Sequence, residues 1–131
     1  MSYICTGYER YMHGSSHFVG NGQCAVFVQG VTGAPLVHAW KPGLKVLGNG
    51  HLIPAGTAIA TFNSHGVYPN MSHGNHAALF LSEDGHTITV IDQYHGKHSH
   101  HPGVSRYSHG GTGNDHSMTG DPNYYYVIEH H

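Results

Sequence analysis

One cysteine of this sequence stands where a thiol could act as a nucleophile. Cys24 follows the glycine-rich segment Gly20-Asn21-Gly22-Gln23 and precedes the apolar run Ala25-Val26-Phe27-Val28. This pattern predicts a loop that ends in a helix N-cap, with Cys24 in the first helical turn, where backbone N–H groups have no intrahelical acceptor. Unpaired donors and the helix dipole favour a thiolate over a thiol. The alternative for Cys24 is simple core packing, because cysteine is among the most buried residue types.

A base, and an acid that could orient it, lie on two neighbouring apolar runs. His76 opens the run 77–81, and Asp92 lies near the end of the run 87–93. Between the runs, Glu83-Asp84-Gly85 suits a three-residue hairpin loop with Gly85 in the left-handed conformation. A hairpin centred on Asp84 places His76 directly opposite Asp92, with β-carbons roughly 5 Å apart on one face. A four-residue loop would shift the register by one residue and break this pair.

Each of these two residues has a competitor or a plainer explanation. His65 and His73 also lie on the approach to the first of the two strands. We favour His76 as the base because it adjoins the strand directly. Asp92 could be an ordinary residue at a strand end, but the predicted pairing with His76 favours a role in orienting the imidazole ring.

The length of 131 residues predicts a single domain, 1–131, with one hydrophobic core. The Cys24 segment is expected to form a short buried helix that ends near Gly30 or Gly33, although its Val and Phe content would also suit a strand. The region 32–50 is expected to be a connecting loop that carries Trp40, which belongs either to the core or to the wall of a cleft.

Two further strands are expected on either side of a long loop. Residues 57–62 and 124–128 are rich in the apolar, β-branched and aromatic residues that favour strands. The stretch 95–123 is dense in Gly, Ser and His and is expected to be a loop, which at this length is usually functional or mobile. We find no internal repeat.

The composition excludes some classes of partner. Charged residues make up only 9% of the chain and the formal net charge is −2, so we expect no nucleic-acid partner at neutral pH. The 16 histidines add positive charge below about pH 6.5. No apolar stretch approaches the roughly 18 residues of a membrane span, and the first 12 residues lack the apolar core of a signal peptide. We therefore expect synthesis in the cytoplasm, no membrane insertion, and export only by machinery that does not use such a peptide.

The two cysteines do not form a disulfide framework. Pairing Cys5 with Cys24 would silence the proposed nucleophile, so we expect both to be free thiols.

Three short motifs surround these positions: Gly22-Gln23-Cys24-Ala25, Gly74-Asn75-His76-Ala77 and Val90-Ile91-Asp92-Gln93. They resemble the papain-like peptidoglycan hydrolases of the NlpC and CHAP type. One departure is Tyr94, which stands where CHAP enzymes typically carry an asparagine after the third polar residue.

A further set of motifs consists of Pro54-Ala55-Gly56-Thr57-Ala58-Ile59-Ala60-Thr61-Phe62, Tyr68-Pro69 and Gly74-Asn75-His76-Ala77-Ala78. With these, the sequence looks more narrowly like the third family of type VI secretion amidase effectors.

The resemblance implies an α+β, papain-like fold in which a helix carrying the cysteine packs on a small antiparallel sheet. It also implies a mechanism that the residues support on their own. The Cys24 thiolate attacks a peptide carbonyl, His76 protonates the leaving amine, and Asp92 fixes the imidazole ring. The Cys24 N–H and the Gln23 side chain are the expected oxyanion donors, and Gln93 and Trp40 are further candidates for contact with the substrate. No metal or organic cofactor is required.

The resemblance further implies a substrate, a place of action and a partner. The substrate would be the peptide stems or cross-links of bacterial peptidoglycan, with the bond between D-alanine and diaminopimelate favoured over the D-glutamate linkage by analogy. The protein would be injected into the periplasm of a target bacterium. A producing cell would then need a cognate inhibitor, or immunity protein, that inserts into the Cys24 cleft.

Two alternatives of other classes remain. A histidine-rich metal-binding protein is suggested by His98-Ser99-His100-His101, together with His95, His109 and His116, but the spacing matches no defined site. A non-catalytic cell-wall-binding module on the same scaffold would tolerate the loss of Cys24. His130 and His131 are given no weight, because they resemble the remnant of a purification tag.

Overall fold

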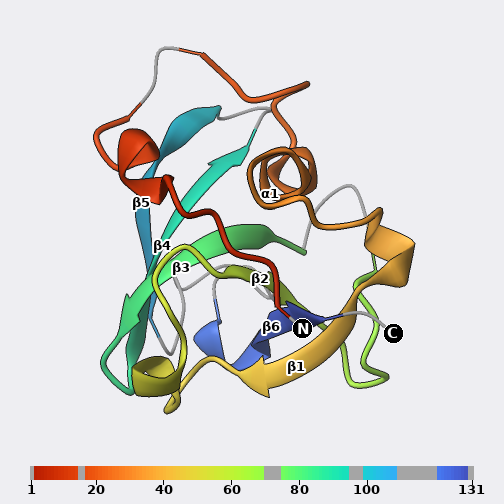
Figure 1. The fold of residues 1–131 in the computed structure, drawn as a ribbon. Coiled ribbons are helices and arrows are strands. Elements are labelled where there is room, and N and C mark those ends of the chain that lie inside the picture. Colours follow the sequence, from red (N-terminus) through yellow and green to blue (C-terminus); the bar gives the residue numbers. More distant parts are fainter. Residues whose placement is uncertain (1, 15–16, 70–74, 95–98, 109–120, 130–131) are drawn as a thin grey trace.

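A six-stranded antiparallel sheet and the helix α1 (Cys24–Thr32) form the framework of the protein in the computed structural model (Figure 1). The structure describes the whole chain except residues 1, 15–16, 70–74, 95–98, 109–120 and 130–131. The strands lie in the spatial order β1-β6-β2-β3-β4-β5. Their bounds are β1 Lys41–Lys45, β2 Ala58–Thr61, β3 Ala77–Glu83, β4 Thr87–Tyr94, β5 His100–Ser108 and β6 Tyr125–Glu129. The α+β class expected from the sequence is confirmed.

The helix α1 begins at Cys24, as the sequence predicts, and its boundaries have clear local causes. Gln23 is the N-cap in an extended conformation without a side-chain capping bond. Asn21 is therefore not the cap; its Oδ1 instead accepts the Gln23 N–H at 3.0 Å and tightens the turn before the helix. The helix ends at Gly33, which adopts the left-handed conformation typical of a C-terminal cap.

The sheet separates two apolar clusters, because successive residues of a strand point to opposite faces. Alternation is clear in β2, where Ala58 and Ala60 join the cluster beneath α1 while Ile59 joins the other. Phe27 and Val28 of α1 are fully buried against the first cluster, over β3 and β4. Burial of a side chain such as Phe27 contributes about 1.5–3 kcal/mol. The nucleophile is thus carried by a helix that packing holds on the sheet.

The hairpin of β3 and β4 forms, but its register differs from the predicted one. Near the turn, Glu83 pairs with Ile88, and Thr87 already belongs to β4. Gly85 has the expected positive φ of 91°, yet it is not the last residue of the loop, because His86 follows it. A hairpin centred on Asp84 is therefore wrong.

A β-bulge then changes the register of the hairpin once more. The register shifts by one residue between Phe80 and Ser82, so that Phe80 pairs with Val90. Extending this register to the start of β3 places His76 opposite Tyr94, two residues beyond Asp92. Positions two apart share a face of the sheet, so His76 and Asp92 are diagonal neighbours rather than a directly opposed pair.

Two edge strands occupy regions where only loops are expected from the sequence. β1 lies within the region 32–50 and pairs with β6; it contains Pro42, which is tolerated at an edge because the ladder needs fewer donors there. β5 lies within 95–123, pairs with β4 and contains Pro102 and Gly103. The loop prediction is thus wrong for His100–Ser108, while 95–98 and 109–120 lie outside the described residues. The strands expected at 57–62 and 124–128 are present as β2 and β6.

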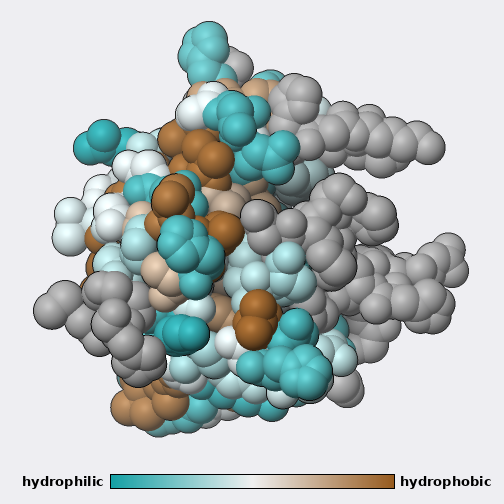
Figure 2. All heavy atoms as spheres, turned by 90° about the vertical axis from the view of Figure 1, so that its right-hand side faces the viewer, coloured by the Kyte–Doolittle hydropathy of each residue, from teal (hydrophilic) through white to brown (hydrophobic). Residues whose placement is uncertain are grey.

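The surface offers few broad apolar areas in the view of Figure 2, where the coloured apolar residues form small groups among hydrophilic ones. Leu36 and Leu52 are the most exposed large hydrophobic side chains in the described part of the chain. Isolated exposed apolar residues are normal for a globular protein. Among the described helices, none has the length and apolar character needed to cross a membrane.

Candidate functional site

The segment before α1 makes a tight approach that depends on two glycines. Gly20 and Gly22 have φ values of 61° and 90°, a conformation that residues with a β-carbon rarely adopt. A β-carbon on Gly20 would also lie 2.4 Å from a methyl carbon of Val26, so the segment can fold closely over the first turn of α1. Cys24, which opens that turn, remains half-buried at the edge of the cluster beneath α1.

The side chain of Gln93, on β4, joins the segment before α1 to the sheet by hydrogen bonds. It is fully buried; Oε1 accepts the Val19 N–H at 2.8 Å, and Nε2 donates to the Val19 carbonyl at 2.8 Å and to the Gln23 carbonyl at 2.9 Å. A primary amide has one acceptor oxygen and two donor hydrogens, and in Gln93 the oxygen and both hydrogens are hydrogen-bonded. Gln93 therefore positions the segment that delivers Cys24, and the prediction that it contacts substrate is not supported by its geometry.

His76 and Asp92 are in direct contact, as the sequence predicts. Nε2 of His76 lies 2.7 Å from Oδ2 of Asp92, and both side chains are buried. The backbone of His76 is fixed by Thr61 of β2, whose Oγ1 accepts the His76 N–H at 3.0 Å and whose N–H donates to the His76 carbonyl at 2.9 Å. With Nε2 engaged by the carboxylate, Nδ1 is the ring nitrogen left for the thiol.

Three side chains of β5 complete the environment of the Asp92 carboxylate. The Tyr107 hydroxyl donates to Oδ2 at 2.6 Å, and the Ser105 hydroxyl donates to Oδ1 at 2.6 Å. Nε2 of His100 lies 3.3 Å from Oδ1. Burial disfavours the charged carboxylate, but hydrogen bonds from His100, His76 and Ser105, with the charge of His76, hold the pKa of Asp92 well below its usual range. Asp92 is thus ionised at neutral pH.

The thiol of Cys24 and the imidazole of His76 shift each other's ionisation. Burial opposes the charged form of His76, but the charge of Cys24 and hydrogen bonding to Asp92 raise the pKa of His76 to about 10. Burial likewise opposes the thiolate, but the charge and hydrogen bond of His76, with the Ala77 N–H, lower the pKa of Cys24. These opposite shifts favour a thiolate–imidazolium pair, the reactive state of a cysteine nucleophile.

A second polar pair lies beside the thiol. The Tyr68 hydroxyl is 3.9 Å from Sγ of Cys24, and Nδ2 of Asn75 donates to that hydroxyl at 2.9 Å. Tyr68 is buried, and its ring packs against Trp40 with centroids 4.8 Å apart. Burial and the charge of Cys24 raise the pKa of Tyr68, so its hydroxyl stays protonated.

The other two residues expected to contact substrate lie in different settings. Trp40 is 2% exposed and donates from Nε1 to the Pro35 carbonyl at 2.9 Å, so of the two expectations for Trp40 the core position is correct. The Gln23 side chain is exposed next to Cys24. Its backbone is held by Asn21 and Gln93.

The competing histidines and the second cysteine can also be placed. His65 is exposed in the turn around Asn63, away from the buried contact that His76 makes with Asp92, and His73 lies outside the described residues. Cys5 is buried, and both cysteines are free, as expected.

The histidine-rich region gives no metal site within the part of the chain that the structure describes, where no group of three or more His, Cys, Asp or Glu side chains could hold an ion. His95, His98, His109 and His116 lie outside the described residues. His100 contacts Asp92, and the ring of His101 packs against Phe18.

Five residues of the site are not among those predicted from the sequence, and most were hidden by the loop prediction for β5. Tyr107 and Ser105 lie on that strand, where Val104 and Tyr107 are the only strand-favouring signal. Asn75 is part of the motif before His76, but no role follows from the motif alone. The five residues are Tyr68, Asn75, His100, Ser105 and Tyr107.

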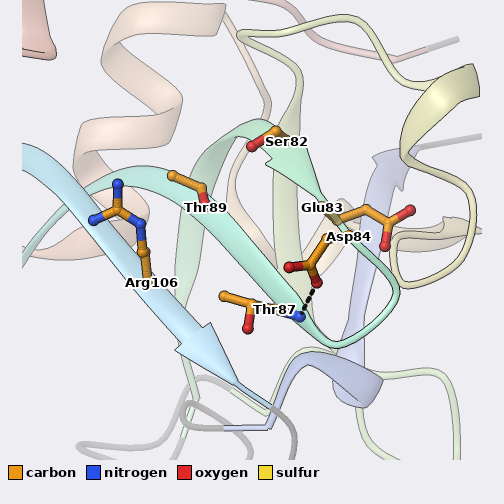
Figure 3. Close-up of a pocket in the computed structure, with 6 residues that line it drawn as sticks. All are labelled: Ser82, Glu83, Asp84, Thr87, Thr89 and Arg106. Carbon is orange, nitrogen blue, oxygen red and sulfur yellow. Dashed lines mark hydrogen bonds between the residues drawn. The ribbon is translucent and has the colours of Figure 1, made fainter.

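A separate shallow pocket lies near the turn of the β3–β4 hairpin, where residues of β3, β4 and β5 line it (Figure 3). Its acidic groups are engaged by backbone donors: Asp84 accepts from Thr87, and Glu83 turns toward the Gly50 N–H. None of the residues that line it is a cysteine or a histidine. They are Ser82, Glu83, Asp84, Thr87, Thr89 and Arg106.

Comparisons with known proteins place the chain among amidase effectors. The family described as "Domesticated amidase effector 2" matches residues 1–128. The "Type VI secretion amidase effector 2 protein" of Salmonella typhi is 44% identical over 77 residues, which are 58% of this chain and 56% of that protein, so the match spans little more than half of the relative. A solved structure of "Type 6 secretion amidase effector 2 (Tae2)" superposes with a TM-score of 0.78 at 31% identity, covering 98% of this chain and 95% of the other.

These matches confirm the resemblance to type VI amidase effectors that the motifs indicate. They name the second family of such effectors, whereas the motifs resembled the third. They also favour the amidase interpretation over a histidine-rich metal-binding protein.

Proposed function

Because this chain belongs to the domesticated amidase effector 2 family, we propose that it is a cysteine amidase that hydrolyses peptide bonds of bacterial peptidoglycan. The observation that carries the proposal is the buried 2.7 Å contact of His76 with Asp92 beside a thiol whose pKa is lowered by His76. Core packing of a cysteine does not explain such an arrangement. An ionised carboxylate beside the imidazole orients the ring and stabilises its positive charge in a thiolate–imidazolium pair.

The catalytic roles follow from the position of each group. The Cys24 thiolate attacks the carbonyl carbon and forms the C–S bond, while the carbonyl electrons move to oxygen. The His76 imidazolium then gives its proton to the leaving amine as the C–N bond breaks, and a water molecule activated by the neutral imidazole hydrolyses the thioester. Asp92 keeps the ring oriented and stabilises its positive charge. The Cys24 N–H, in the first turn of α1, is available to the oxyanion.

The finer assignments rest on analogy with papain-like enzymes. A helix bearing the nucleophile, packed on an antiparallel sheet that supplies the base, is the arrangement of the NlpC and CHAP type. We propose the cross-link between D-alanine and diaminopimelate as the bond that is cut, the periplasm of a target bacterium as the place of action, and a cognate inhibitor as the partner of the Cys24 cleft. Both relatives are type VI secretion effectors by name, which supports this place of action.

The direct test is analysis of muropeptides by liquid chromatography and mass spectrometry after incubating purified peptidoglycan with the protein. We expect the wild type to release new products whose masses identify the bond, and Cys24→Ala to release none. Iodoacetamide should abolish the activity and a chelator should leave it intact. Equal product from the wild type and Cys24→Ala would contradict the proposal, as would loss of activity with the chelator alone.

The cognate inhibitor can be tested with the same variant. Cys24→Ala, used as bait in the producing cell, should retain a partner that blocks the wild-type enzyme in the muropeptide assay. If the producing cell yields no protein with that inhibitory effect, the injected-effector assignment is wrong, even where the amidase activity itself is present.

A further inference from the structure

Within the described part of the chain, the hydroxyl of Tyr68 is a side-chain donor that lies beside the nucleophile. It lies 3.9 Å from Sγ of Cys24, in contact with the sulfur but too far for a strong bond. Tyr68 follows a turn that Asn63 fixes, because Oδ1 of Asn63 accepts the N–H groups of His65 and Val67 at 2.9 and 3.1 Å. The hydroxyl is therefore presented to the sulfur by an ordered segment of the chain.

The hydrogen bond from Asn75 sets the direction in which the hydroxyl proton can point. Nδ2 of Asn75 is a donor, so the 2.9 Å bond occupies a lone pair of the Tyr68 oxygen and leaves its proton unused. The neighbouring acceptor is the sulfur of Cys24, which as a thiolate can only accept. The same contact supports the lowered pKa of Cys24, although the contribution of Tyr68 is smaller than those of His76 and the Ala77 N–H.

We propose that Tyr68 is a further catalytic group, which donates a hydrogen bond from its hydroxyl to the oxyanion of the tetrahedral intermediate. This inference rests on the proposed amidase function and adds the side-chain donor for which Gln23 was the sequence-based candidate. When the C–S bond forms, the sulfur loses its negative charge and the carbonyl oxygen, one bond away from the attacked carbon, gains it. The hydroxyl proton then turns from sulfur to that oxygen, and no proton is transferred.

The surroundings of Tyr68 hold the donor in place before substrate arrives. Tyr68 is 5% exposed, its ring packs on the buried indole of Trp40, and Trp40 is fixed by the bond from Nε1 to the Pro35 carbonyl. A donor that needs no reorganisation is what makes an oxyanion hole effective. The exposed side chain of Gln23 lacks such support. Trp40 thus acts as a positioning residue through Tyr68 and does not itself touch substrate.

The test compares hydrolysis with alkylation in Tyr68→Phe, using a dimeric, cross-linked muropeptide as substrate and iodoacetamide as the thiol reagent. Loss of one oxyanion donor is expected to lower kcat by about 100-fold. KM should change little, because the donor acts mainly in the transition state. The alkylation rate of Cys24, measured at a pH where the thiolate is fully formed, should stay at the wild-type value, because alkylation generates no oxyanion. Tyr126→Phe, a tyrosine on β6 that packs against Phe62, is the matched control and should keep wild-type kcat.

Each result decides between the roles. A wild-type kcat in Tyr68→Phe would overturn the inference, and so would a parallel fall of alkylation and hydrolysis, which would make Tyr68 a support for the thiolate only. Should Tyr68→Phe fail to fold, Asn75→Ala keeps the tyrosine ring and hydroxyl but removes the bond that directs the hydroxyl proton. It should lower kcat while Cys24 alkylation stays at the wild-type rate, and a wild-type kcat in Asn75→Ala would then overturn the inference. A wild type that leaves the muropeptide intact would instead refute the proposed function, which separates the two failures.

Discussion

At the scale of single residues, the proposed chemistry depends on a charge pair between Cys24 and His76. Each group raises the population of the charged form of the other, and Asp92 adds a fixed negative charge behind the ring. The pair is stable between the lowered pKa of Cys24 and the value of about 10 for His76. Within that range the thiolate and the proton for the leaving amine are present together.

We therefore expect Cys24 to react with iodoacetamide well below the pH of about 8.5 at which an ordinary cysteine is half ionised. Replacement of His76 by Gln should move the midpoint of the alkylation profile upward, because the positive charge that lowers the pKa of Cys24 is lost. The measurement is the rate of Cys24 alkylation between about pH 4 and 10, followed by peptide mass spectrometry. Below the midpoint the rate should fall about tenfold per pH unit, because the thiolate fraction does.

Cys5 provides an internal control in the same samples, because it is buried and lies outside the site. Its alkylation should be slow in the native protein and should not respond to His76→Gln. An unchanged Cys24 midpoint in that variant would contradict the ion pair.

Tyr107 offers a second test, because its hydroxyl donates to the same Asp92 oxygen that His76 contacts. Tyr107→Phe should reduce kcat roughly tenfold, since one hydrogen bond to a charged group contributes about 1.5–3 kcal/mol. We expect the loss to be accompanied by an upward shift of the alkaline limb of the pH–rate profile, because an Asp92 carboxylate without the Tyr107 hydrogen bond is a stronger acceptor for the imidazolium and raises the pKa of His76.

Tyr94→Phe is the matched control for Tyr107→Phe. The Tyr94 ring also lies edge-on to His76, with centroids 6.2 Å apart, and stacks on His100, but its hydroxyl has no part in the bonds to Asp92. Its profile should match that of the wild type. A purely structural role for Tyr107 would lower the amount of folded protein without moving the alkaline limb.

At the scale of elements, the β3–β4 hairpin explains which part of the site was predictable. The contact between His76 and Asp92 was predicted from a register that is wrong in detail, yet the contact is present. The reason is parity: the turn shifts the pairing by three residues from the predicted register, and the bulge at Leu81 takes one of them back. The remaining shift of two residues leaves both side chains on one face of the sheet. Sequence pattern gives the face of a residue more reliably than its exact partner.

Edge strands were the part that the sequence could not reveal. β1 contains Pro42 and Gly43, and β5 contains Pro102 and Gly103, residues that argue against a strand when local propensity is the only guide. Their pairing with β6 and β4 overrides that propensity. Because β5 was missed, the groups that surround Asp92 were missed with it. Tyr68 and Asn75 were missed for another reason: their contact joins two connecting segments, for which no periodicity exists.

The hydrogen bonds from the Gln93 side chain to Val19 and Gln23 lead to a prediction for the stability of the fold. Gln93→Ala leaves the backbone groups of Val19 and Gln23 without their buried partner and should lower the free energy of unfolding by roughly 2–4 kcal/mol. Gln23→Ala, the neighbouring control, removes an exposed amide and should change stability by less than about 0.5 kcal/mol. Urea denaturation of both variants measures the difference.

The two glutamines also differ in what they predict for activity. Gln93→Ala should lower kcat beyond its effect on the folded fraction, because the segment that delivers Cys24 is loosened. Gln23→Ala should retain most of the activity if Tyr68 is the side-chain donor. Retained stability in Gln93→Ala would show that the buried bonds of Gln93 are replaced by other partners.

At the scale of the whole molecule, Asp92 links stability to pH. Its folded pKa lies below the value of about 3.9 for an unfolded aspartate, so the ionised carboxylate stabilises the fold above about pH 4. That contribution is lost as the pH falls toward the folded pKa. Tyr107→Phe raises the folded pKa and reduces the contribution, so the stability difference between wild type and variant should be largest near neutral pH and should shrink below about pH 4.

Urea denaturation of the two proteins at several pH values between about 2.5 and 7 checks this prediction, with Tyr94→Phe again as the control. The stability difference at neutral pH should be about that of one hydrogen bond to a charged group. A stability difference that stays constant over the whole range would mean that Tyr107 acts through packing, independently of the charge on Asp92.

The bonds of Gln93 to Val19 and Gln23 also bear on the order in which the molecule is assembled. They join positions 74 and 70 residues apart in the chain, and contacts of such separation form late because the intervening chain must be ordered first. Until then Cys24 is an ordinary thiol, without the imidazolium that lowers its pKa or the carboxylate that supports the imidazolium. The reactivity that we propose for Cys24 is therefore expected only once the tertiary structure is complete. The rate at which alkylation by iodoacetamide becomes fast during refolding would report the closing step of folding itself.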